Sequence, residues 1–134
     1  MNNYTEILRA HNLKATPQRL EIAGALDLHG HINIENLYVI MLKKFNSISL
    51  ATIYKNIHLM LESSFIQEVK IPQAKSVYEL TKASHSHAVC SKCSCIEDLT
   101  VDLLTIKNDA SHKTNFKIDN ASLVFSGLCK NCQN

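Results

Sequence analysis

Two C-x-x-C pairs constrain this chain more than any other feature of its sequence. Cys90 and Cys93 form one pair, Cys129 and Cys132 form the other, and 35 residues separate them. Each pair sets two thiolates on one side of a tight turn, and two pairs complete the tetrahedral sulfur set of a structural zinc site. The spacing therefore predicts a fold in which the 35 intervening residues bring the second pair back beside the first.

A redox-active dithiol is the main alternative for such a pair. A thioredoxin-like motif opens a helix after a strand, which the run Cys90-Ser91-Lys92-Cys93 does not obviously do, and it would leave the second pair without a role. The fifth cysteine, Cys95, is expected to be a small half-buried thiol rather than a ligand or sensor. An odd number of cysteines also fits poorly with a closed set of disulfides.

Bulk composition sets wide limits. The chain has 134 residues, enough for one domain or two very small ones, with 46% hydrophobic and 19% charged residues. A net charge of +2 permits nucleic-acid binding without indicating it. The run "MNNYTEILRAHNL" lacks the blocks of a signal peptide, and no apolar run approaches membrane-spanning length. We expect a cytoplasmic protein, and a reducing compartment favours metal binding or redox chemistry over structural disulfides.

The first half has the periodicity of four short helices, within residues 4–13, 15–29, 33–45 and 47–64. Thr16 is the expected N-cap of the second helix, with Pro17 at its first position, and Ser49 caps the fourth. In the fourth helix, apolar side chains share one arc: Leu50, Ile53, Ile57, Met60 and Leu61. Ala51, Thr52, Lys55 and His58 lie on the other side, with Tyr54 at the boundary.

Two strand-like runs follow these helices, residues 65–71 and 76–80, joined by "PQAK". Helices followed by a hairpin predict a winged helix-turn-helix, whose last helix enters the DNA major groove. The alternative is a plain helical domain whose fourth helix exposes small polar residues.

The composition changes near residues 81–84, where we place a hinge. Beyond it we expect an amphipathic helix from Val101 to His112 and two strands within residues 115–129, around the turn Asp119-Asn120. So short a unit needs a metal, a partner or both to remain folded. The expected fold is therefore α+β, with a winged-helix DNA-binding domain (1–82) and a zinc-stabilised α/β dimerisation domain (83–134).

Histidines and carboxylates suggest a second metal site. Residues i and i+2 of a strand point to one face, so His85 and His87 can share an ion. Further ligands are available at Glu79, Glu97 and Asp98, with His29 and His31 farther back. Such a mixed nitrogen and oxygen set suits iron(II) or manganese(II), and zinc remains possible. A zinc deaminase is excluded, because the triplet His85-Ser86-His87 lacks that enzyme's proton-carrying glutamate.

The ordered set of motifs resembles the ferric uptake regulator family of metal-dependent repressors. The matching pieces are "TPQR" at 16–19, "LATIYKNI" at 50–57, "HSHAVCSKC" at 85–93 and "CKNC" at 129–132. They occur in the family's order and cover nearly the whole chain.

The resemblance implies a homodimer that binds double-stranded operator DNA. It also implies that the protein is not an enzyme. It places structural zinc on Cys90, Cys93, Cys129 and Cys132, and regulatory iron(II) or manganese(II) on His31, Glu79, His85, His87 and Asp98. The expected DNA contacts are Lys14, Arg19, Ala51, Thr52, Tyr54 and Lys55. Phosphates are assigned to Arg19 and Lys55, base edges to Ala51 and Thr52, and thymine methyls or bases to Tyr54.

Within the family, the peroxide-responsive branch is the one this chain is most similar to. It has Asp98 where iron sensors tend to have glutamate, and Ser84 and Ser86 where iron sensors often carry ligands for a further site. Glu79 and the run Ser94-Cys95 depart from the peroxide pattern. The resemblance implies sensing through iron-dependent oxidation of His31 and His85. The alternatives are an iron- or manganese-responsive repressor of the same family and, in a different class, a zinc-stabilised thiol oxidoreductase.

Overall fold

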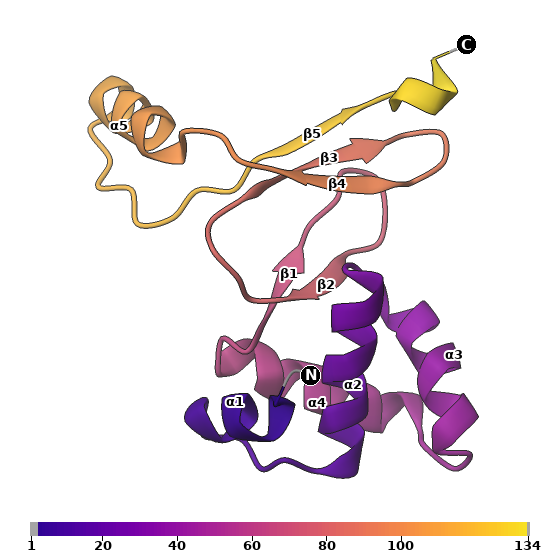
Figure 1. The fold of residues 1–134 in the computed structure, drawn as a ribbon. Coiled ribbons are helices and arrows are strands. Elements are labelled where there is room, and N and C mark those ends of the chain that lie inside the picture. Colours follow the sequence, from indigo (N-terminus) through magenta and orange to yellow (C-terminus); the bar gives the residue numbers. More distant parts are fainter. Residues whose placement is uncertain (1–2, 134) are drawn as a thin grey trace. The chain divides into compact units, whose positions relative to one another are not determined.

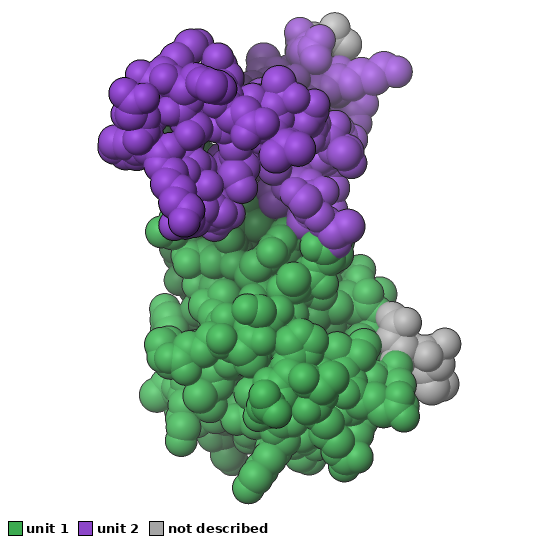
Figure 2. Space-filling model, turned by 90° about the vertical axis from the view of Figure 1, so that its left-hand side faces the viewer, with its two compact units in different colours: residues 1–82 green, residues 83–134 purple. Residues whose placement is uncertain are grey.

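The computed structural model describes residues 3–133 and divides the chain into two compact units, Met1–Lys82 and Ala83–Asn134 (Figure 2). Unit 1 contains four helices and a two-stranded sheet (Figure 1). Unit 2 contains a three-stranded sheet, one α-helix and a short 3₁₀ helix. The expected α+β class is confirmed. Among the described residues, no helix has the length and apolar character needed to cross a membrane.

The helices of unit 1 begin where their caps predict. They are α1 (Tyr4–Ala10), α2 (Pro17–His29), α3 (Ile34–Lys44) and α4 (Leu50–Glu62). The side chain of Thr16 accepts a hydrogen bond from the Arg19 N–H, and that of Ser49 accepts one from the Thr52 N–H. Each cap satisfies an N–H group that the helix itself leaves without a partner.

One hydrophobic core holds unit 1 together. It is built from side chains of all four helices and the hairpin, among them Leu8, Ile22, Leu37, Ile53 and Ile66. Ile53, Ile57 and Met60 of the predicted α4 arc are buried. Leu61 is half-buried, and Leu50, the first residue of α4, remains 40% exposed. Asn56 is a further buried residue of α4 that the predicted apolar arc did not include.

The expected hairpin is confirmed as β1 (Ile66–Val69) paired antiparallel with β2 (Val77–Leu80). It follows α4 directly, so unit 1 has the helix order and wing of a winged helix-turn-helix. A bridge between Ile32 and Tyr78 ties the segment before α3 to β2, with hydrogen bonds of 3.1 and 2.8 Å. This bridge sets the residue before Ile32 beside the residue after Tyr78.

Unit 2 is a sheet of strand order β4-β3-β5, with α5 between β4 and β5 in the chain (Figure 1). The strands are β3 (Ser86–Cys90), β4 (Ile96–Leu99) and β5 (Val124–Gly127). Strand β4 pairs antiparallel with β3, whereas β5 pairs parallel to it. The helix α5 spans Leu103–Thr114, with Asp102 as its N-cap, within two residues of the predicted helix.

One prediction in unit 2 was wrong. Residues 115–123 form no strand, and only the later part of the expected pair exists, as β5. Asn115 ends α5 in a left-handed conformation, with φ of 60°. The Phe116 N–H then donates to Thr114 Oγ1 at 3.2 Å, and Ser111 Oγ donates to the Phe116 carbonyl at 2.5 Å. The N–H and carbonyl groups of Phe116 are therefore bonded to side chains of α5, whereas in a strand they would pair with a neighbouring strand.

Unit 2 has almost no hydrophobic core of its own. Among its described residues, only Val89 and Cys90 are buried and apolar, and α5 buries no side chain. Large apolar side chains are instead exposed at Leu104, Phe116 and Phe125. Burial of this kind does not offset the conformational entropy of about 50 ordered residues. The unit therefore needs cross-links or a partner surface.

Candidate metal centres and nucleic-acid interface

The first centre is a cluster of thiols at one end of the unit 2 sheet. Strand β3 ends at Cys90, a turn carries Cys93, and the chain beyond β5 brings Cys129 back to them. The Sγ atoms of Cys93 and Cys129 are 3.8 Å apart. Zinc–sulfur bonds of about 2.3 Å at tetrahedral angles place two sulfurs about 3.8 Å apart. The donors therefore fit a tetrahedral zinc ion.

The turn between β3 and β4 has the hydrogen bonds of a metal knuckle. The Cys93 N–H donates to Cys90 Sγ at 3.4 Å, and the Ser94 N–H donates to the Cys90 carbonyl at 2.9 Å. Ser94 adopts a left-handed conformation, with φ of 66°, which turns the chain back into β4. Backbone donors that face a sulfur stabilise the thiolate, the form that binds zinc.

The sulfur group differs from the one that the sequence predicts. Four ligand atoms lie within 4.8 Å of one another, and they belong to Cys90, Cys93, Cys95 and Cys129. Cys132 is not in this group, although its thiol interacts with those of Cys129, Cys90 and Cys93. Cys95 is exposed rather than half-buried, which corrects the expectation for that residue.

The thiols divide into two kinds by the direction of their pKa shifts. Backbone N–H groups of Cys129 and Cys93 lower the pKa of Cys90 to about 5. The pKa of Cys129 is also lowered, chiefly by a hydrogen bond from Cys132. The thiol of Cys95 donates to Cys93, and that of Cys132 donates to Cys129, which raises the pKa of each donor to about 12. Cys90 is therefore the thiol of this centre that ionises most readily, and binding of a metal by the protonated thiols releases their protons.

Histidine and carboxylate ligands form two further sets, one in each unit. In unit 1 the Ile32–Tyr78 bridge brings His31 to Glu79, and His31 Nε2 lies 2.9 Å from Glu79 Oε2. Glu79 is only 1% exposed, and its Oε1 accepts a 2.7 Å hydrogen bond from Gln67, its partner across the β1–β2 ladder. The sequence analysis did not identify Gln67, although the pairing of the two predicted hairpin strands could have placed it opposite Glu79.

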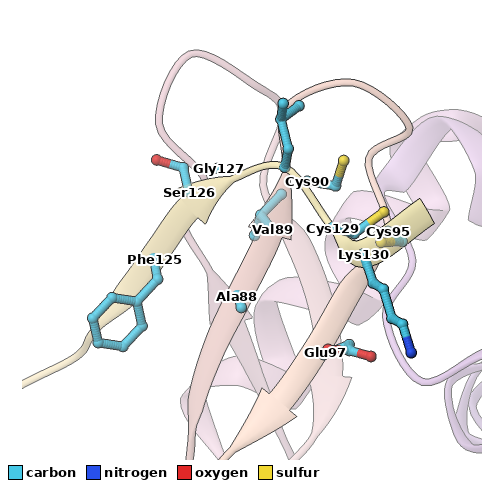
Figure 3. Close-up of a pocket in the computed structure, with 11 residues that line it drawn as sticks. Ala88, Val89, Cys90, Cys95, Glu97, Phe125, Ser126, Gly127, Cys129 and Lys130 are labelled. Atoms are coloured by element: carbon cyan, nitrogen blue, oxygen red, sulfur yellow. The ribbon is translucent and has the colours of Figure 1, made fainter. Parts of the chain in front are cut away.

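In unit 2 the second set consists of His85, His87 and Asp98. His87 and Asp98 are paired across β3 and β4, with His87 Nε2 3.5 Å from Asp98 Oδ1. His85 Nε2 lies 3.9 Å from the same oxygen, and its ring centroid is 4.6 Å from that of His87. The expectation that the two imidazoles share a face is confirmed. Glu97, the neighbour of Asp98, instead lines a cleft of about 320 Å³ beside Cys95 and Cys129 (Figure 3).

The candidate DNA-contacting residues lie on α4 and around the start of α2. Ala51, Tyr54 and Lys55 are exposed on α4, and Tyr54 retains 50% of its accessible surface. Thr52 is half-buried, and its hydroxyl hydrogen-bonds to Ser49 Oγ at 2.9 Å. Ala51 and Lys55 lie on the face of α4 opposite its buried arc, as the helical period predicts, and Tyr54 was predicted at the boundary of that arc.

Arg19 is held from both sides. Its Nε donates to Asn56 Oδ1 at 3.1 Å, and a terminal guanidinium nitrogen donates to the carbonyl of Lys14 at 3.2 Å. Asn56 is 7% exposed, and its amide also donates to the Thr52 carbonyl at 3.0 Å. Sequence reasoning missed Asn56, because a polar residue within an apolar arc gives no sign of its partner.

Fold and ligand sets together define the class: a winged-helix protein with donor groups for metal ions in both units. A model of the ferric uptake regulator family matches residues 10–126. The chain therefore belongs to the ferric uptake regulator family.

Individual relatives agree with this assignment. The chain is 30% identical over 129 residues to the peroxide operon regulator of Bacillus subtilis strain 168, covering 95% of this chain and 89% of that protein. It is 29% identical over 132 residues to the ferric uptake regulation protein of the same strain, covering 93% and 89%. The crystal structure of a Campylobacter jejuni peroxide stress regulator is 35% identical, with a TM-score of 0.74, and 98% of this chain and 100% of that chain are covered. Identities of 30% and 29% do not separate a peroxide regulator from an iron regulator, so the residues of the sites must decide.

Proposed function

We propose that this protein is a metal-dependent, DNA-binding transcriptional repressor that responds to peroxide through oxidation of its own ligand histidines. The observation that carries the proposal is the division of the imidazole and carboxylate ligands between the units. His31 and Glu79 belong to unit 1, and His85, His87 and Asp98 belong to unit 2. An ion that uses both sets favours the arrangement of the units that lets them meet, by as much as its affinity differs between arrangements.

The donor types support iron(II) or manganese(II) as the regulatory ion. Three imidazoles and two carboxylates are a mixed nitrogen and oxygen set without thiolate. The thiols supply a separate site, and we assign zinc to Cys90, Cys93, Cys129 and Cys132 as a structural ion. Because unit 2 has so small a core, zinc binding contributes directly to its folding.

A homodimer bound to double-stranded DNA completes the proposal. Leu104, Phe116 and Phe125 are exposed apolar side chains of unit 2, the kind of surface that a partner subunit covers. The exposed face of α4 provides the DNA contacts, with Tyr54 and Ala51 toward bases and Lys55 and Arg19 toward phosphates. In this scheme the protein binds DNA and metal and is not an enzyme.

Peroxide sensing follows from the choice of ion. Bound iron(II) supplies one-electron reduction of peroxide next to its own ligands, chemistry that manganese(II) supplies poorly. We propose that the oxidised ligand is His31 of unit 1 or His85 of unit 2, either of which gains one oxygen atom. An oxidised imidazole is a weaker ligand, so the set that contains it loses affinity for the ion and DNA is released.

The test is peptide mapping by mass spectrometry after brief peroxide treatment of the iron-loaded and manganese-loaded protein. We expect one added oxygen at His31 or His85 in the iron form only. His58 on α4 and His112 on α5 are internal controls, because both are exposed and neither belongs to a ligand set. Unmodified histidines together with disulfides among the zinc cysteines would instead assign a thiol switch. Unmodified histidines and cysteines, with DNA binding that follows iron concentration alone, would favour the iron-responsive alternative.

A further inference from the structure

The zinc centre of unit 2 contains one more thiol than a tetrahedral ion can bind. Cys95 enters the cluster through the register of the β3–β4 hairpin. Val89 pairs with Ile96, so the next pair outward is Cys90 with Cys95, and the Cys90 N–H donates to the Cys95 carbonyl at 2.9 Å. Side chains of a directly opposed pair project from the same face of a sheet. Cys95 therefore lies beside Cys90 and Cys129 at the end of the strands (Figure 3).

Cys132 comes from another element, and its thiol interacts with those of Cys129, Cys90 and Cys93 without belonging to the group of sulfurs that lie within 4.8 Å of one another. It is the last residue of the 3₁₀ helix η1 (Lys130–Cys132), whose turn is closed by a hydrogen bond from the Cys132 N–H to the Cys129 carbonyl at 3.0 Å. Cys90, Cys93 and Cys129 are thus common to two possible four-sulfur sets. Cys95 completes one set from the hairpin, and Cys132 completes the other from η1.

We propose that Cys95 and Cys132 are alternative fourth ligands of the zinc ion bound by Cys90, Cys93 and Cys129. This inference rests on the structural zinc of the proposed function. Exchange between the sets needs no oxidant, because the incoming thiol gives up its proton as the outgoing thiolate takes one up. The site therefore keeps four sulfurs on zinc while one cysteine is free, and either Cys95 or Cys132 can be lost without loss of the ion.

Zinc content of single and double variants tests the inference. Cys132→Ser and Cys95→Ser should each retain one zinc ion per chain after dialysis against a moderate chelator, whereas the double variant should lose it. Cys93→Ser is the matched control, because Cys93 belongs to both sets and its replacement should remove zinc whichever fourth ligand is present. If Cys132→Ser loses zinc as completely as Cys93→Ser, Cys95 is not a ligand and the inference is overturned. A wild-type protein without bound zinc would instead contradict the structural zinc of the proposed function.

A second measurement uses the unaltered protein and does not depend on how variants fold. Zinc-loaded protein is treated briefly with a thiol-alkylating reagent, and the modified cysteines are mapped by mass spectrometry. We expect one alkyl group per chain, divided between Cys95 and Cys132, with the other three cysteines protected. Label confined to Cys95 would show that Cys132 is a fixed ligand, and label confined to Cys132 would show that Cys95 is. Either result overturns the exchange.

Discussion

Replacement of Asn56 by alanine tests how the candidate DNA-binding face is held in place. Asn56 is a buried residue of α4 that accepts a hydrogen bond from Arg19 Nε at 3.1 Å and donates one to the Thr52 carbonyl at 3.0 Å. Arg19 lies on α2, so the bond joins the second helix of unit 1 to the fourth. Asn56→Ala removes this link and leaves the charge of Arg19 in place.

The structure sets the size of the effect. A hydrogen bond to a charged group contributes about 1.5–3 kcal/mol, and the half-buried Arg19 regains part of that from water. The Thr52 carbonyl still accepts the backbone N–H of residue 56 within the helix. Loss of the additional bond from the Asn56 side chain therefore costs little. Alanine also favours a helix over asparagine by about half a kcal/mol. We expect the free energy of unfolding of the zinc-loaded protein to fall by about 1–2 kcal/mol, measured by urea denaturation with the helical circular dichroism signal.

DNA binding should separate the position of Arg19 from its charge. Affinity for a random duplex is measured by fluorescence anisotropy over a range of salt concentrations. Arg19→Ala should weaken binding and lower the salt slope by about one, the value for one lost phosphate contact. Asn56→Ala should weaken binding with a nearly unchanged slope. Asn36→Ala is the control, an exposed helix position of the same unit. If Asn56→Ala matches this control in both stability and affinity, the proposed anchoring of Arg19 is refuted.

Three further predictions concern the other sites. Cys93→Ser should lose zinc and the dimer together, and a zinc-free dimer on size-exclusion chromatography with metal analysis would contradict the structural assignment. Lys55→Ala should weaken binding to all DNA sequences and flatten its salt dependence, whereas Tyr54→Ala should reduce discrimination between a selected operator and random DNA. Gln67→Leu should lower manganese affinity about 10–100-fold, because Gln67 orients Glu79. An unchanged manganese affinity, measured by isothermal titration calorimetry, would show that Gln67 does not orient Glu79 for metal binding.

Local signals explain which parts of the fold could be predicted from the sequence. Thr16 and Ser49 cap their helices through hydrogen bonds to N–H groups three residues further along the chain. Ile53 and Ile57 follow the helical period. The β1–β2 hairpin likewise depends on adjacent segments. These features need no knowledge of distant residues, which is why they were found.

The features that were missed depend on long-range partners. The first of the two strands expected within residues 115–129 does not form, and the strand that does form, β5, is the one that pairs in parallel with β3. Asn56 is buried because Arg19, 37 positions away, supplies a donor. Cys95 joins the sulfur group through the ladder register, which the spacing of the C-x-x-C pairs does not reveal. In each case the deciding contact lies outside the motif.

The division of ligands sets a quantitative demand on the proposed repressor. Moving a two-state equilibrium from 1:99 to 99:1 requires an ion to bind one state about 10⁴-fold more tightly, which corresponds to about 5.5 kcal/mol. Under the proposal, His85, His87 and Asp98 bind the ion in either state, so they contribute affinity without selectivity. Under the proposal, the selectivity comes from His31 and Glu79, which join only in the DNA-binding arrangement. Oxidation of His31 therefore removes selectivity and oxidation of His85 removes affinity, and either change releases the protein from DNA.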